Sequence, residues 1–409
     1  MTSQPRPTGR HDFHVGIVCA LPHEADAVAL LFDCFWDSDD ETPLGRAVGD
    51  TNAYMAGRIG QHDVILVVLP NIGTSAAAAA AASFRSSYSG LKLMFLVGIC
   101  GGVPEVAGQD VFLGDVVVSK SIVQYDYGRQ YPESFQVKTS INDSLGRASK
   151  SIRSILAKLE MEINRERLQA QAGKHLNTLQ AALLRKRWRR DYRYPGVAQD
   201  QLFDRDYVHK HHTACGLCAK EPAPFCESAS LALCNDLSCD ESRLVRREHH
   251  LDGEKYEPNI FVGCIGSGNA VMKSGRDRDR IAQAHGCIAF EMEGAGAWEE
   301  IPSIVVKGIC DYSDSHKDKR WQNFAAATAA CVTRAILERH VPSDDGATAS
   351  ASPEQDNSTL PVEDPSPRAA ANSTELIGVA TVQVVGESFL GIRSDMELGS
   401  CKGMYITSS

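Results

Sequence analysis

Three acidic residues stand at the ends of apolar runs late in the chain, where carboxylates could do chemistry. Glu291 and Glu293 flank Met292 at the end of one run, and Asp311 follows another. We expect the first two carboxylates to point to opposite faces of their strand, so that only one of them faces a ligand. A free carboxylate beside a proton donor suits cleavage of an N-glycosidic bond. In that reaction the sugar develops positive charge while the leaving base needs a proton.

Apolar runs of the buried-strand type must position these acids. We predict strands over residues 14–20, 63–69, 93–97, 115–119, 260–265, 287–293 and 303–310. Helices are expected over residues 22–35, from the alanine run 76–82, and over residues 321–339. Strands that alternate with helices predict a three-layer α/β/α sandwich around a central mixed, mostly parallel sheet. Ligands of such sheets bind beyond the carboxyl ends of the strands, which is where the acids and the glycine-rich turns 98–102 and 266–269 fall.

Six motifs in order resemble the purine nucleoside phosphorylase / uridine phosphorylase superfamily. The resemblance covers about residues 13–340, and within the superfamily it is closest to the methylthioadenosine/S-adenosylhomocysteine nucleosidases. It extends to the nucleoside phosphorylase-like domain of fungal receptor-like proteins. The motifs are Val15-Gly-Ile-Val-Cys-Ala-Leu-Pro-His-Glu24, Val97-Gly-Ile-Cys-Gly-Gly102, Leu113-Gly-Asp-Val-Val-Val-Ser119, Gly266-Ser-Gly-Asn269, Phe290-Glu-Met-Glu-Gly294 and Gly308-Ile-Cys-Asp311.

The resemblance implies roles for individual residues. Glu293 is expected to hold the 2′- and 3′-hydroxyls of the ribose, with Met292 packed under the sugar. Asp311 is expected to protonate the leaving base, and an Asp there favours a 6-aminopurine nucleoside such as adenosine. Glu24 is expected to position the attacking water. The residues expected to bind the substrate are Glu291, Met292, Glu293, Cys100, Gly101, Asn269, Val271 and Met272.

Departures from the phosphorylase pattern favour hydrolysis over phosphorolysis. Leu96 and Ile99 stand where phosphorylases carry an Arg and a Ser that bind phosphate, and Glu24 and Asp26 would repel a dianion. Water is therefore the expected co-substrate, with no cofactor. Lys307 stands where relatives often have Arg, so the charge remains but the bidentate fork is lost, which could reduce activity. A phosphorylase, a nucleoside sensor without turnover and an interaction scaffold remain as alternatives.

Composition limits the remaining classes of protein. The 409 residues are 43% hydrophobic but contain no membrane-spanning run, and the first residues lack a signal-peptide core. We therefore expect a cytoplasmic protein whose 13 cysteines are reduced thiols. A net charge of −10 argues against a nucleic-acid partner. By the resemblance, residues 124–128 lie near a subunit contact, so a homodimer is expected.

The chain divides into three parts. Residues 1–12 are expected to be a disordered N-terminus, and residues 13–341 a nucleoside phosphorylase-like domain. Residues 342–409 read as a mostly disordered acidic tail, because the part from Val341 onward carries a net charge of −7. A helical, Cys/His-rich insertion is expected at about residues 140–255, within which the basic run 185–190 reads as a solvated helix end.

The insertion holds the one local pattern that suggests a metal. Cys215-Gly-Leu-Cys218 is a C-x₂-C pair within a stretch, residues 209–239, that contains five cysteines and three histidines. No second pair at a standard spacing follows it, so the sequence favours a loop of free thiols and no metal site.

Overall fold

The computed structural model describes residues 5–37, 44–184, 188–213, 215–220, 225–248 and 256–340. The predicted acidic tail, residues 342–409, and the first half of the basic run lie outside these residues. Among the described helices, none is long and apolar enough to cross a lipid bilayer.

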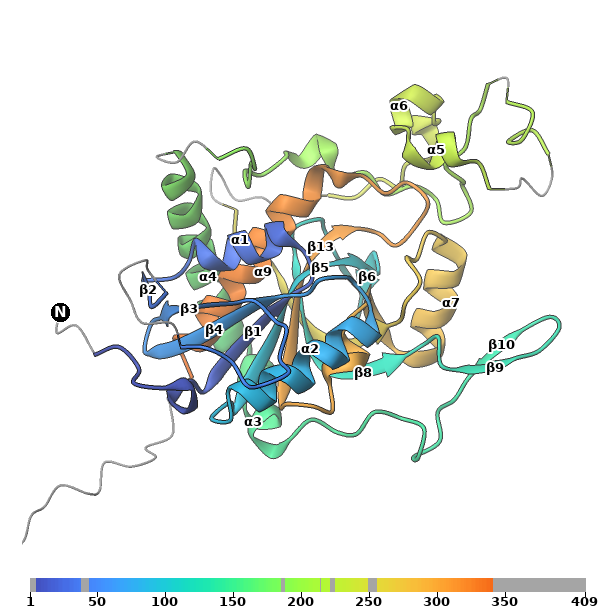
Figure 1. The fold of residues 1–409 in the computed structure, drawn as a ribbon. Helices are drawn as coiled ribbons and strands as arrows, with labels where there is room; N and C mark the ends of the chain where they lie inside the picture. Colours follow the sequence, from blue (N-terminus) through green and yellow to red (C-terminus); the bar gives the residue numbers. More distant parts are fainter. Residues whose placement is uncertain are drawn as a thin grey trace, which may run out of the picture. The chain divides into compact units, whose positions relative to one another are not determined.

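One large sheet forms the centre of the described fold (Figure 1). Its strand order is β12-β11-β8-β13-β5-β1-β4-β3-β2. The bounds are β1 Val15–Cys19, β2 Cys34–Phe35, β3 Tyr54–Ile59, β4 His62–Val68, β5 Leu93–Gly102, β8 Val116–Gln124, β11 Ile260–Ser267, β12 Cys287–Glu291 and β13 Ser303–Asp311. Two small hairpins join β6 (Glu105–Val106) to β7 (Gln109–Asp110) and β9 (Gly128–Gln130) to β10 (Phe135–Val137).

The sheet is mixed, as the sequence predicts. Strands β1 and β4, β1 and β5, β5 and β13, β8 and β11, and β11 and β12 run parallel. The pairs β8 and β13, β5 and β12, β3 and β4, and β2 and β3 run antiparallel. Because β12 pairs with β5 as well as with β11, five strands close on themselves at one end of the sheet. This closure brings together strand ends that an open sheet would keep apart.

Helices cover both sides of the sheet (Figure 1). On one side α9 (Gln322–Leu337) packs on β13 and β5 and contacts α1 (Pro22–Ala29) and α4 (Glu162–Leu184). On the other side α2 (Thr74–Ser87) packs its buried alanines and Phe84 against the sheet. The fold is therefore the predicted α/β class with a central mixed sheet.

Several element bounds differ from the prediction. Strand β5 runs on through the glycine turn to Gly102, so residues 98–102 are strand and not loop. Helix α1 ends at Ala29, well short of residue 35, because Cys34 and Phe35 pair with β3 as an edge strand. Strand β3 and the charged helix α7 (Gly275–His285) were not predicted, since neither shows a clear apolar period.

The predicted insertion does not stand apart from the sandwich over its first part. Helix α3 (Lys150–Leu159) precedes α4, and α4 packs on α9. The apolar side of α4, which includes Leu168, Leu176 and Leu179, belongs to the main hydrophobic core. Only the later part, with the short helices α5 (Glu227–Leu231) and α6 (Cys234–Leu237), has a small apolar cluster of its own.

The prediction of a disordered N-terminus is wrong for the residues just before β1. Arg10–Asp12 form a 3-10 turn, in which the Asp12 carboxylate accepts hydrogen bonds from the backbone N–H groups of Thr8 and Gly9. The backbone of His11 also packs against Gly90, where an added Cβ would lie 1.9 Å from the carbonyl oxygen. These local bonds order a segment whose composition alone reads as a tail.

Candidate active site

Gly101 is the residue at which the strands of the site meet. It pairs with Phe290 of β12 and with Asp311 of β13, so both strand ends reach the same point of β5. A Cβ on Gly101 would lie 2.1 Å from Ser313 Oγ and 2.7 Å from Asp311 Oδ1. The absence of a side chain here therefore lets Asp311 and Ser313 lie against β5.

A cavity of about 610 Å³, open to solvent, lies at this point. Nine of the ten residues that the sequence predicts for the site line it, and they are Glu24, Cys100, Gly101, Val271, Met272, Glu291, Met292, Glu293 and Asp311. Asn269 does not line the cavity. Its side-chain oxygen instead accepts hydrogen bonds from the N–H and hydroxyl of Thr74, at 3.0 Å each, and so holds the start of α2.

Lys307 lies beneath the cavity among three carboxylates. Its Nζ is 3.0 Å from Glu293 Oε2 and 3.7 Å from Glu291 Oε2, and its side chain is 2% exposed. Burial alone would lower the pKa of Lys307, but Glu293, Glu291 and Glu24 together raise it. The ammonium therefore stays charged and offsets the negative charge of the acids.

The predicted placement of Glu291 and Glu293 on opposite faces is wrong. Side chains two residues apart on a strand share a face, and here both carboxylates point to the same ammonium. Strand β12 also ends at Glu291. The Glu291 carboxylate accepts hydrogen bonds from the backbone N–H groups of Glu293 and Gly294, both at 2.9 Å. Burial raises the pKa of Glu291. Glu291 thus fixes the turn that carries Glu293.

Glu293 has fewer ties to its own chain. Its Oε2 accepts from Lys307, and its Oε1 lies 3.3 Å from the backbone nitrogen of Gly73. The residue is 5% exposed and lines the cavity. Its carboxylate is therefore held in place with acceptor capacity left for a ligand.

Glu24 is the third residue of α1, and its carboxylate is tied to two segments of backbone. Oε2 accepts from the N–H groups of Ala20 and Leu21 at 2.9 and 2.8 Å, and Oε1 accepts from Ile99 at 2.8 Å. Burial raises the pKa of Glu24 to about 7, against the lowering effect of Lys307. A carboxylate has about four acceptor positions, so one remains for a ligand or water.

Asp311 is the last residue of β13, and it pairs with a cation that the sequence did not single out. Lys317 Nζ lies 2.8 Å from Asp311 Oδ1, which also accepts the Ser313 N–H at 2.8 Å. Burial would lower the pKa of Lys317, but Asp311 raises it. Ser313 has a φ of 54°, a left-handed conformation that turns the chain back over Asp311.

Ser313 itself carries a free hydroxyl at the cavity. Its Oγ is buried and has no hydrogen-bond partner within the part of the chain that the structure describes. Buried hydroxyls without partners are rare in folded proteins, so this one is available to hydrogen-bond a ligand or water in the cavity. The sequence assigned neither Ser313 nor Lys317 a role, because only the turn after β13 places them at the cavity.

The rest of the cavity wall is largely apolar. Tyr125 and Phe290 meet edge to face with ring centroids 5.6 Å apart, and the Tyr125 hydroxyl donates to the Ala270 carbonyl at 2.9 Å. Met272 and Met292 also line the wall. An apolar wall opposite a group of carboxylates can hold a flat ring and a polyhydroxylated sugar together.

Acidic residues outnumber basic ones in the lining. Of the described residues that line the cavity, Lys317 is the only Lys or Arg, and it is paired with Asp311. Ile99 lines the cavity with an alkyl side chain, and its N–H is taken by Glu24.

Comparison with known proteins places this chain among related sequences and folds. A nucleotide-binding leucine-rich repeat (NLR)-like protein of Hyaloscypha variabilis is 30% identical over 332 residues, which is 80% of this chain and 29% of that protein. The chain thus spans under a third of the length of this curated relative.

Solved structures of similar fold include two enzymes of Helicobacter pylori and one of Streptococcus pneumoniae. The H. pylori futalosine hydrolase is 15% identical, with a TM-score of 0.46, and the alignment covers 80% of this chain and 99% of that one. The H. pylori 5′-methylthioadenosine/S-adenosylhomocysteine nucleosidase matches at 15% identity and a TM-score of 0.45, with the same coverage. The S. pneumoniae MTA/SAH nucleosidase, bound to 8-aminoadenine, matches at 15% and 0.46, again with the same coverage.

The family resemblance drawn from the six motifs is confirmed by a family model. The model of the phosphorylase superfamily matches residues 14–176, a range that holds strands β1 to β8, Glu24 and the glycine segment of β5. Over residues 14–176, less than half of the 409 residues, the chain matches the phosphorylase superfamily.

Proposed function

We propose that this protein hydrolyses the N-glycosidic bond of a purine nucleoside of the adenosine type, releasing the free base and ribose. The observation that carries the proposal is the lining of the cavity, in which Glu24, Glu293 and Asp311 lie opposite an apolar wall. Among the described lining residues the one cation, Lys317, is paired with Asp311. Such a lining favours a sugar that becomes positively charged and disfavours a phosphate dianion.

Glu293 and Met292 would hold the ribose. The Glu293 carboxylate, fixed by Lys307 at 3.0 Å, can accept hydrogen bonds from the 2′- and 3′-hydroxyls. The Met292 side chain lies beside it on the cavity wall, where it can pack against the sugar ring. Lys307 pairs with Glu293 without entering the cavity lining, so the lysine acts as a positioning residue.

Glu24 would activate the water. Three backbone N–H groups occupy most of its acceptor positions, and the one that remains can accept a proton from water. The water oxygen bonds to C1′ as the bond from C1′ to N9 breaks, and one water proton goes to Glu24. The electron pair of the broken bond leaves with the purine.

Asp311 and Ser313 would assist departure of the base. A proton from Asp311 neutralises the leaving purine at N7, and the Ser313 hydroxyl, buried without a partner in the described chain, can hydrogen-bond the same edge. An Asp at this place can also accept from a 6-amino group, which favours adenosine over a 6-oxopurine nucleoside. Val271 and Met272 lie on the cavity wall, where they would pack against the base.

The test is incubation of the purified chain with adenosine in phosphate-free buffer, followed by quantification of adenine and of the sugar product. We expect adenine and ribose, with no rise in rate as phosphate is added. A strict phosphate requirement with ribose 1-phosphate as product would instead establish a phosphorylase.

Asp311→Asn tests the acid. The amide keeps the hydrogen-bonding shape but cannot give up a proton, so kcat should fall by roughly 10² or more. Asp318→Asn is the matched control, because Asp318 lies on the same loop outside the cavity lining and caps the turn at Arg320. Turnover of the Asp311→Asn variant near that of the wild type would remove Asp311 from the mechanism.

A second candidate is a nucleoside sensor with little turnover. Lys317 Nζ lies 2.8 Å from Asp311 Oδ1, so the expected acid is already engaged by a cation of the same loop. The relative from H. variabilis is an NLR-like protein, a class whose name denotes nucleotide binding. Calorimetric binding of adenosine without release of adenine would favour the sensor. If adenosine is neither bound nor cleaved, the remaining alternative is that the sandwich acts as an interaction scaffold.

A further inference from the structure

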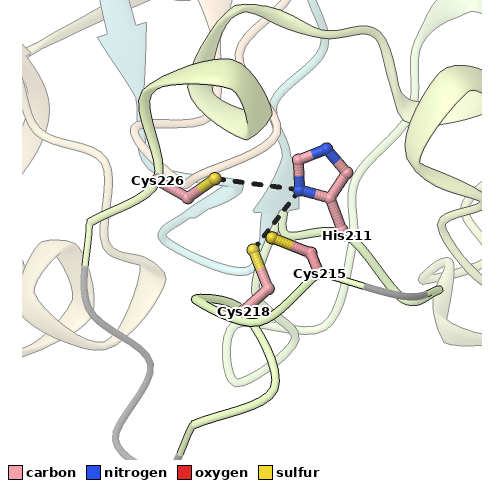
Figure 2. Close-up of side chains that lie close together, drawn as sticks. All are labelled: His211, Cys215, Cys218 and Cys226. Atoms are coloured by element: carbon pink, nitrogen blue, oxygen red, sulfur yellow. Dashed lines mark hydrogen bonds between the residues drawn. The ribbon is translucent and has the colours of Figure 1, made fainter.

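Four soft ligand atoms converge in the later part of the insertion (Figure 2). The ring nitrogen and sulfur atoms all lie within 4.8 Å of one another, and they belong to His211, Cys215, Cys218 and Cys226. In Figure 2 the three thiols point toward the same side of the imidazole, with its Nδ1 facing Cys218 and Cys226. We propose that these four side chains bind a zinc ion.

The distances fit a tetrahedral ion. With bonds of about 2.3 Å to sulfur and about 2.0 Å to nitrogen, a tetrahedral zinc places a nitrogen and a sulfur ligand roughly 3.6 Å apart. His211 Nδ1 lies 3.4 Å from Cys218 Sγ and 3.8 Å from Cys226 Sγ. Three cysteines and one histidine form a common closed structural zinc set.

The segment also needs such an ion for its stability. Among its described residues, the segment's own apolar cluster has only three buried members, Cys218, Ala229 and Leu237. So small a core cannot offset the entropy of ordering some thirty residues, and segments of this kind are usually held by metals or disulfides. None of the described cysteines is in a disulfide.

A second site is carried by different observations. His209 Nδ1 lies 3.6 Å from both Cys234 Sγ and Cys239 Sγ. The other ring nitrogen of His209 lies 3.0 Å from the Ala232 carbonyl, to which it can only donate. This bond leaves the Nδ1 lone pair facing the two sulfurs, which is the usual arrangement of a metal-binding histidine.

His316 supplies the fourth ligand of the second site. Its side chain is 1% exposed, and neither ring nitrogen has a hydrogen-bond partner in the described part of the chain. One of its ligand atoms lies within 4.8 Å of those of His209 and Cys239. A buried imidazole without a partner is costly, and a metal would satisfy it. The ligand atoms of His209, Cys239 and His316 lie within 4.8 Å of one another, and Cys234 lies beside His209. We infer that these four side chains bind a second zinc ion.

The two sets explain why the sequence favoured free thiols. The first set, from His211 to Cys226, lies between His209 and Cys234 of the second set, and His316 comes from the loop after β13, outside the Cys/His-rich stretch. Local spacing could not show the second set. Because His316 precedes Lys317, the partner of Asp311, the second ion would fasten the insertion to the loop that carries the candidate acid.

The experiment measures zinc in the full chain, purified with a reducing agent and without chelators. Metal analysis by mass spectrometry should give two zinc ions per chain. Cys215→Ser with Cys218→Ser should lower the content by one, and Cys234→Ser with Cys239→Ser should also lower it by one. His212→Ala is the matched control, because its ring stacks on Tyr207, belongs to neither set, and should leave both ions bound.

Reconstitution keeps the proposal testable if a variant fails to fold. Chelator-stripped wild-type protein should take up two equivalents of Co²⁺ and develop the visible absorption of tetrahedral thiolate coordination. Failure to bind Zn²⁺ or Co²⁺ under reducing conditions would overturn both sites. Disulfides among these cysteines that persist under reducing conditions would also overturn both sites. If the chain binds one metal ion and the Cys215/Cys218 change abolishes that binding, the second site is overturned alone. If it binds one metal ion and only the Cys234/Cys239 change abolishes that binding, the first site is overturned.

Discussion

The carboxylate of Glu24 is buried, and its ionisation should control activity. Its pKa of about 7 means that the base form becomes dominant only above neutrality. We expect kcat/KM for adenosine to rise about tenfold per pH unit below pH 7 and to level off above it. Stability should change in the opposite sense. Between the usual value of 4.5 and about 7 the folded state binds more protons than the unfolded state, so the contribution of Glu24 to stability falls as pH rises.

Glu24→Gln is the control for this pH dependence. It should lower turnover, abolish the rise of kcat/KM with pH below pH 7, and leave binding of an adenosine analogue largely intact. A limb that persists unchanged in the glutamine variant would assign the titration to another group.

Lys307 should be essential for stability because it neutralises buried acids. Lys307→Met would leave Glu291 and Glu293 buried without a cation, and we expect a loss of about 3–5 kcal/mol in the free energy of unfolding. Lys120→Met is a matched control, since Lys120 pairs with Glu160 with the side chains 58% and 40% exposed. That change should cost at most about 1 kcal/mol. Equal losses in chemical denaturation would contradict the role given to Lys307.

For individual residues, the sequence could indicate which acids lie at the cavity but not which groups bind and position them. The motifs place Glu24, Glu293 and Asp311 at strand or helix ends, and the fold brings them to one cavity. Lys317 is six residues from Asp311 and pairs with it only because Ser313 turns the chain. Asn269 follows a glycine turn as predicted, but its amide is used by Thr74. Such contacts depend on three-dimensional packing, which residue spacing does not encode.

Among the elements, the contact of α9 with β13 depends on a glycine. A Cβ on Gly308 would lie 1.9 Å from the carbonyl oxygen of Ala325, a backbone atom that cannot rotate away. We expect Gly308→Ala to lower the free energy of unfolding by about 1–3 kcal/mol or more. Gly146→Ala is the control, because a Cβ there would meet nothing within 4 Å. Thermal unfolding of both variants checks this, and equal midpoints would show that α9 can shift at little cost.

The strands could be predicted because each is a long apolar run, whereas the edges of the sheet could not. The predicted runs at residues 63–69 and 303–310 match β4 and β13 to within one residue at each end. Strand β3 contains Arg58 and Gly57, and α7 buries little beyond Arg278 and Ile281, so neither has the expected pattern. The pairing of β12 with β5 joins residues nearly 190 positions apart, which no local pattern reveals.

At the scale of the whole chain, the insertion serves the site as well as the fold. Helix α4 adds a layer behind α9, and the later part reaches the loop after β13 through His316. With the proposed second zinc ion in place, the loop that follows Asp311 would be held at one end by β13 and through His316 by the insertion. The insertion is therefore better described as a support of the site than as a separate module.

The last prediction concerns the β9–β10 hairpin, which extends from the body after β8 (Figure 1). In the sequence it follows Tyr125, which lines the cavity. A lone two-stranded hairpin is marginally stable, and Tyr127 and Tyr131 are 42% and 49% exposed on this segment. We expect a second copy of the chain to cover it, giving a light-scattering mass of twice 44.4 kDa. Tyr131→Asp should shift this mass toward the monomer, whereas Ile141→Asp, at a site 93% exposed, should not. A monomeric wild type at every concentration tested would refute the dimer.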